Sequence, residues 1–160
     1  DNWTQDMDIG GGRIIGEACH FIDLMRYLVG RKIVSVFSLA MGGAGEAGAS
    51  SDKMTINLEF EDGSHGAVHY FANGSKAFPK ERLEVFSGSG LLQLDNYRRL
   101  VGFGWPGFRK MNLWRQDKGQ RACAKAFMDA VAGRISSPIE VQDIFDAIRI
   151  MHVQTRKPST

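Results

Sequence analysis

This sequence has no long apolar run, little net charge and few cysteines. Each of these features bears on the class of protein to which it can belong. No apolar run approaches the roughly 20 residues of a membrane-spanning helix. A formal net charge of only +2 favours no particular partner. The two cysteines, Cys19 and Cys123, are too few for a disulfide scaffold. Both fall on the apolar side of an expected helix, so we expect buried free thiols in a reducing, cytoplasmic compartment.

What is present is the composition of an ordinary soluble domain. The 160 residues are 43% hydrophobic and 24% charged, enough to form one core, and we expect a single domain over residues 1–160. The chain begins at Asp1 rather than Met, which suggests a fragment, a processed product or the ordered part of a longer chain.

Hydrophobic periodicity predicts a helix, then a series of strands, then two helices. We expect helices over 16–29, 117–133 and from Pro138 onward, strands over 33–41, 54–60, 65–72, 82–87 and 91–96 with a weaker one at 98–104, and irregular structure over 105–116. The last helix is expected to bury Val141, Ile144, Phe145, Ile148 and Met151. Segregated elements of this kind predict an α+β fold with an open, mostly antiparallel sheet and helices packed on one face.

The most informative segment is the glycine run Gly10–Gly12, which leads into a helix carrying Glu17, His20 and Asp23. At about 100° per residue, His20 lies roughly 60° from each carboxylate. An imidazole between two carboxylates suits proton transfer near neutral pH, and the glycines allow a ligand or second domain to come close. The same residues also fit a structural histidine hydrogen-bonded to Asp23.

The glycine run is not a nucleotide-binding motif. No Gly-Lys-Ser/Thr follows it, which excludes a phosphate-binding loop, and no strand precedes it, which excludes a dinucleotide fingerprint. A strand–GxGxxG–helix unit occurs nowhere else in the sequence. We therefore do not expect this chain alone to bind a dinucleotide productively.

The segment GGGRIIGEACHFIDLMRYLVG (10–30) resembles the start of the C-terminal domain of the glucose-fructose oxidoreductase/inositol dehydrogenase/MocA family. The resemblance continues through Glu-Asp-Gly (61–63), through ERLEVFSGSGLLQLD (81–95), which is similar to the family's E-x-x-G-x-x-G-x-L strand pair, and to the helix near Pro138. It covers most of the chain. It implies the C-terminal substrate-binding and oligomerisation domain of an oxidoreductase acting on a sugar, polyol or nucleotide sugar. It also implies NAD or NADP, bound mainly by an N-terminal Rossmann domain absent from this sequence, and a homo-oligomer formed through the open sheet face.

The resemblance assigns His20 as the catalytic acid/base and Asp23 as the Asp that follows it. The family's acid commonly lies four residues before the histidine, where this chain has Gly16, so either Glu17 replaces it or His20 works with Asp23 alone. Substrate contacts are expected from Gly12, Arg13, Trp3 and Lys76, with Phe78 and Lys80 at the border of the pocket. A non-catalytic ligand-binding or oligomerisation domain, with a structural His20, is the alternative.

Two other groups of residues are candidates for binding a ligand. His65 and His69 share a strand face but lie roughly 13 Å apart at strand rise, too far to bind one metal ion, so no metal site is expected. Residues 98–121 combine seven Lys and Arg with interleaved aromatics, a pattern seen in single-strand binders. We favour a connecting arm whose aromatics pack on the sheet, and arginines that meet nucleotide-sugar phosphates are a further option. Neither nucleic acid nor a membrane is an expected partner.

Overall fold

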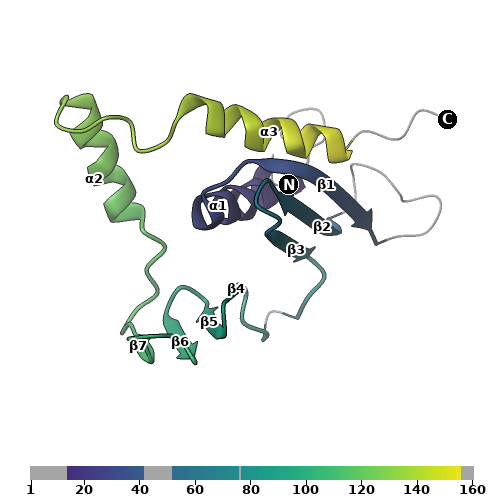
Figure 1. Ribbon diagram of the computed structural model, residues 1–160, viewed down its shortest axis with the longest axis horizontal. Coiled ribbons are helices and arrows are strands. Elements are labelled where there is room, and N and C mark those ends of the chain that lie inside the picture. The colour runs from purple at the N-terminus through teal and green to yellow at the C-terminus, as the bar shows by residue number, and fades with distance from the viewer. Residues whose placement is uncertain (1–13, 42–51, 76, 156–160) are drawn as a thin grey trace. The chain divides into compact units, whose positions relative to one another are not determined.

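The computed structural model describes residues 14–41, 52–75 and 77–155, without the side chains of 151–155 (Figure 1). Contacts divide the chain into two compact units. Unit 1 consists of Asp1–Asn73 and Ile139–Thr160, and unit 2 of Gly74–Pro138. The elements are η2 (Ile14–Ala18), α1 (Cys19–Val29), β1 (Ile33–Ala40), β2 (Lys53–Phe60), β3 (His65–Phe71), β4 (Arg82–Ser87), β5 (Gly90–Asp95), β6 (Arg99–Phe103), β7 (Lys110–Asn112), α2 (Gln120–Val131) and α3 (Val141–Thr155).

Unit 1 is built on the antiparallel sheet β1-β2-β3. Strand β2 alternates strictly, and its four apolar residues Met54, Ile56, Leu58 and Phe60 are all buried on one face. The helical residues Ile14, Ala18 and Ile22 complete the core against this face. The tight turn between β2 and β3 follows from Asp-Gly, with Gly63 at φ 82° and the Phe60 N–H donating to the Ser64 carbonyl at 2.9 Å.

The first helix begins differently from the expected α-helix over 16–29. Residues Ile14–Ala18 form a π-helical turn, and regular α-helix starts at Cys19. Its end is as expected, because Gly30 takes the left-handed conformation (φ 67°) and its N–H donates to the Arg26 carbonyl at 2.8 Å.

The expected buried face of the last helix is wrong. Four of its five residues are exposed, Val141 by 65%, Ile144 by 47%, Phe145 by 61% and Ile148 by 45%, and the side chain of Met151 lies outside the described residues. α3 instead buries Ala147 and turns Asp143 and Asp146 toward Arg26 of α1. α3 thus contacts α1 through an ion pair, while its apolar residue Ile150 packs against the core.

Unit 2 contains the antiparallel sheet β4-β5-β6-β7 and the helix α2. The segment expected to be irregular contributes the short strand β7, which pairs with β6. α2 buries none of its residues: Phe127 is 64% exposed and Val131 68%. Cys123 is exposed as well, so the expectation of two buried thiols is wrong for this one, while Cys19 is half-buried.

The α+β class and the open antiparallel architecture expected from the sequence are confirmed. Every strand pair among the described residues is antiparallel, and the helices of unit 1 pack on one face of its sheet. The strands form two separate sheets, β1-β2-β3 in unit 1 and β4-β5-β6-β7 in unit 2.

Candidate functional site

The start of α1 presents His20 on the side of the helix that faces away from the core. Ile14, Ala18 and Ile22 are spaced by four residues and are at most 2% exposed, so they define the buried face. His20 lies two residues from both Ala18 and Ile22 and falls on the opposite face, where it is exposed. Asp23 is exposed as well and Glu17 is half-buried.

The π-helical turn changes the expected spacing of the two carboxylates. Both His20 and Asp23 lie in α1, so their i, i+3 relation holds. Glu17 lies in η2, whose hydrogen bonds close i→i+5, and the rotation of 100° per residue does not apply there. Single π-helical turns inside α-helices occur frequently at functional sites.

Within the described part of the chain, the side chain of His20 forms no hydrogen bond or ion pair, and neither Asp23 nor Glu17 contacts it through one. The hydrogen bond to Asp23 that a structural histidine would need is therefore missing. Catalytic hydrogen bonds are often formed only when substrate is bound, so the open arrangement is compatible with an acid/base.

Negative charge surrounds the neighbouring thiol. Burial raises the pKa of Cys19, and the carboxylates of Asp23 and Glu17 raise it further. The thiol next to His20 is therefore held in its protonated form at neutral pH.

Most of the expected substrate contacts cannot be placed. Gly12, Arg13, Trp3 and Lys76, together with the glycine run, lie outside the described residues. Gly16, which occupies the position of the missing acid, has open space around it: a Cβ built there meets nothing within 4 Å. Packing among the described residues therefore does not require a glycine at this position.

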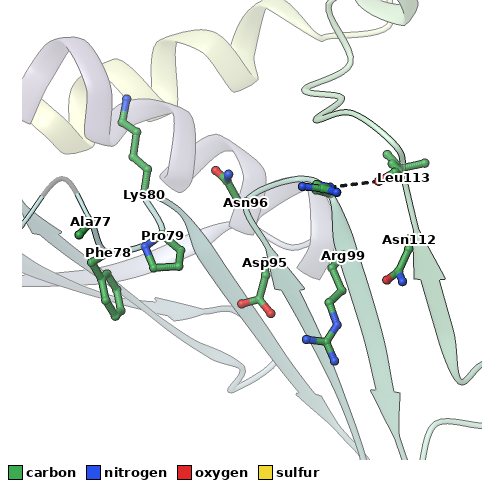
Figure 2. Close-up of a pocket in the computed structure, with 10 residues that line it drawn as sticks. Ala77, Phe78, Pro79, Lys80, Asp95, Asn96, Arg99, Asn112 and Leu113 are labelled. Carbon is green, nitrogen blue, oxygen red and sulfur yellow. Dashed lines mark hydrogen bonds between the residues drawn. The ribbon is translucent and has the colours of Figure 1, made fainter.

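A second feature is a hollow in unit 2, which we call the unit 2 hollow (Figure 2). It has a volume of ≈ 610 Å³ and is lined by Ala77, Phe78, Pro79, Lys80, Asp95, Asn96, Arg98, Arg99, Asn112 and Leu113. Phe78 and Lys80, which were expected at the border of the substrate pocket, line this hollow of unit 2. Sequence reasoning missed Asp95, Asn96 and Asn112, because only the register of β5, β6 and β7 brings them together.

The other candidate residues have local roles. The His69 ring nitrogen lies 3.0 Å from the Thr55 hydroxyl, and the His65 ring nitrogen lies 2.7 Å from the Gly63 carbonyl. No group of three or more potential ligands is found in the described ranges that could hold a metal ion. Of the aromatics in the basic segment, Trp105 and Phe108 pack closely against Gly102, whereas Trp114 is 88% exposed.

Two further findings bear on function. No helix in the described segments is both long and apolar enough to span a bilayer. A dinucleotide-binding fold needs parallel strands with a glycine loop at a helix start, whereas all strand pairs described here are antiparallel. The described residues therefore do not supply a nicotinamide-dinucleotide site of that kind.

Comparison with known proteins decides the family. A family profile described as GFO/IDH/MocA C-terminal domain matches residues 1–93, more than half of the chain. The chain belongs to this family. The resemblance read from the motifs is thereby confirmed. A search of the curated proteins finds no match to this C-terminal domain.

Solved structures share the fold of this C-terminal domain. UDP-N-acetylglucosamine 3-dehydrogenase GnnA from Acidithiobacillus ferrooxidans superposes with a TM-score of 0.72 at 16% identity, over 95% of this chain and 49% of that one. Aldose-aldose oxidoreductase from Caulobacter crescentus, complexed with glycerol, gives 0.72 at 15% identity, over 96% and 47%. GenD2 from gentamicin A biosynthesis, in complex with NAD, gives 0.70 at 20% identity, over 96% and 48%.

The chain spans about half the length of these solved proteins, as the 47–49% coverage of their chains shows. At 15–20% identity the likeness establishes the fold of this C-terminal domain and not its reaction. The established description is thus the C-terminal domain of an oxidoreductase family.

Proposed function

We propose that this chain is the substrate-binding and oligomerisation half of an NAD(P)-dependent oxidoreductase that acts on a sugar, polyol or nucleotide sugar. The observation that carries the proposal is the exposed His20 on the first turn of α1, inside the segment that matches the family. Similar folds in a nucleotide-sugar dehydrogenase and in an aldose oxidoreductase support the substrate class.

In the proposed reaction His20 handles the proton of the substrate hydroxyl. When an alcohol is oxidised, the ring nitrogen of His20 accepts the hydroxyl proton, and Asp23 or Glu17 orients the ring and stabilises the imidazolium. NAD or NADP, expected to be bound mainly by a Rossmann domain of the parent chain, supplies the hydride chemistry. Gly12, Arg13, Trp3 and Lys76 remain the proposed substrate contacts.

The alternative, a non-catalytic domain with a structural His20, is less well supported. The side chain of His20 is exposed and forms no hydrogen bond or ion pair with another described residue, so it contributes no polar contact to the fold there. Removal of its ring should therefore leave the fold intact, which makes a clean test possible.

The test is His20→Ala in the full-length oxidoreductase that contains this sequence. We expect kcat to fall by about two to four powers of ten, the usual contribution of general acid–base catalysis, with the thermal midpoint unchanged. Steady-state kinetics with NAD and NADP over a panel of sugars, polyols and nucleotide sugars provides the measurement.

His65→Ala is the matched control, because His65 is also exposed but its ring nitrogen lies 2.7 Å from the Gly63 carbonyl in the turn between β2 and β3. It should leave kcat unchanged. Near-normal turnover of the His20→Ala enzyme would contradict the catalytic role. Asp23→Asn and Glu17→Gln, compared in the same assay, then identify which carboxylate assists the histidine.

A further inference from the structure

The unit 2 hollow gathers positive charge and hydrogen-bond donors that the proposed reaction at His20 does not use. Three of its lining side chains are cationic (Lys80, Arg98 and Arg99), and one, Asp95, is anionic. Asn96 and Asn112 add side-chain amides, while Phe78 and Pro79 provide an apolar surface. The lining therefore favours an anionic ligand that carries an organic part.

The carboxylate in this hollow is already paired. Across the sheet, Arg82, Asp95, Arg99 and Asn112 are successive register partners on β4, β5, β6 and β7, so they lie in one row on one face. The Arg82 Nε donates to Asp95 Oδ1 at 2.9 Å. The side chain of Arg99, the next residue in the row, forms no hydrogen bond or ion pair within the described part of the chain.

Figure 2 shows the side chains of Asp95, Arg99 and Asn112 extending to the same side of the sheet. Arg99 and Asn112 thus offer donors side by side from neighbouring strands. A guanidinium presents its N–H groups in a planar fork that matches phosphate oxygens, and its charge makes these hydrogen bonds about twice as strong as neutral ones. Lys80, which extends the other way in this view, adds to the positive potential.

The backbone around the hollow is held in place before any ligand arrives. Asn96 and Tyr97 both adopt φ of 50° in a two-residue turn closed by the Arg98 N–H donating to the Asp95 carbonyl at 3.0 Å. The Gln116 side chain donates to the carbonyl and to the Oδ1 of Asn96, each at 2.9 Å. The Arg98 Nε donates to the Leu113 carbonyl at 3.2 Å. Such a site loses little entropy on binding.

We propose that the unit 2 hollow binds the phosphate or diphosphate group of a small molecule. Arg99 and the Asn112 amide hold the anionic oxygens, the free N–H groups of Arg98 and the charge of Lys80 strengthen the attraction, and Phe78 and Pro79 cover the organic part. A nucleic-acid strand fits less well, because Trp105 and Phe108 are packed against Gly102 and offer no continuous stacking surface.

The test is isothermal titration of the 160-residue chain with sodium pyrophosphate at low ionic strength. We expect saturable binding that weakens with salt, and a loss of affinity of about tenfold or more in Arg99→Gln, as for removal of a charge-assisted hydrogen bond. Arg99→Lys, which keeps the charge but not the fork, should be intermediate. Uridine diphosphate titrated in parallel separates the two sources of phosphate, since tighter binding than pyrophosphate indicates an organic phosphate.

Arg121→Gln is the matched control, because Arg121 is an exposed cation of unit 2 that does not line the hollow. It should bind pyrophosphate like the unaltered chain. Absence of saturable pyrophosphate binding would overturn the proposal, as would equal losses in Arg99→Gln and Arg121→Gln, which would indicate only a diffuse field. Tighter binding of an oligothymidylate, weakened equally by both variants, would assign the surface to nucleic acid instead. None of these outcomes depends on turnover at His20.

Discussion

Adjacent side chains at the start of α1 differ sharply in environment, and the difference has chemical consequences. Cys19 is half-buried and packs against the core, whereas His20 is exposed. A thiol reacts as the thiolate, so its reactivity falls when its pKa rises. The group next to the proposed acid/base is therefore chemically quiet, although it lies beside an accessible face.

The two thiols should be distinguished by alkylation. Burial raises the pKa of Cys19, which leaves less thiolate at neutral pH, while Cys123 is exposed. We expect iodoacetamide at pH 7.5 to modify Cys123 at least about tenfold faster than Cys19. Peptide mass spectrometry over time gives both rates. In urea the rates should converge, and similar rates in the folded chain would argue against this difference.

Individual site residues were predictable to different degrees. The exposure of His20 is consistent with the apolar residues spaced four apart on the other face of the helix, a pattern that is visible in the sequence once the helix is known to include Ile14. The row of Arg99 with Asp95 and Asn112 was not predictable, because it depends on strand register, which a one-residue slip would abolish. Local patterns indicate a residue's face but not its neighbours on other strands.

Secondary-structure elements were predicted well where the period of two dominates and less well where helices meet other elements. The alternation of β2 and the turn at Gly63 gave that hairpin correctly. The π-helical turn of η2 has no comparable sequence signal. The apolar stripe of α3 predicted the wrong buried face, since Asp143 and Asp146 face Arg26 and the inward apolar residues are Ala147 and Ile150.

The contact between α1 and α3 should therefore depend on Arg26. Its side chain is only 13% exposed; it pairs with Asp143 and lies 3.7 Å from Asp146. Arg26→Ala leaves two neighbouring carboxylates without their cation, and we expect about 2 kcal/mol of destabilisation, between the values for exposed and buried pairs. Urea unfolding of the full chain, followed by circular dichroism, measures it.

Lys125→Ala is the control for this ion pair. Lys125 pairs with Asp129 at 2.5 Å on α2, but its side chain is 76% exposed, so its removal should cost at most about 0.5 kcal/mol. Equal effects of the two substitutions would mean that Arg26 adds no more than an ordinary surface pair. The orientation of α3 would then need another cause.

At the scale of the whole molecule, two features describe the chain, namely its length relative to its structural neighbours and its division into units. It matches about half the length of solved proteins with this fold and contains two compact units, each with its own antiparallel sheet. The helices of unit 1 cover one face of its sheet, while Phe37 and Leu39 of β1 are 64% and 66% exposed. Within the described residues, these two side chains form an exposed apolar strip along β1, and such a strip favours association.

We expect this face to form the homo-oligomer interface. Phe37 lies opposite Asn57 and Leu39 opposite Thr55, so the apolar side chains lie along β1 next to polar ones on β2.

Phe37→Glu places a charge where a second copy would bury an aromatic ring, which should weaken self-association by about 2 kcal/mol or more, or roughly 30-fold in Kd. Sedimentation velocity at tens of micromolar should show the unaltered chain as an oligomer and Phe37→Glu as a monomer. Phe86→Glu, at an equally exposed phenylalanine of unit 2 (75%), should remain oligomeric. An unaltered chain that sediments as a monomer over this range would rule out the interface, because Phe37 would then not be buried against a second copy.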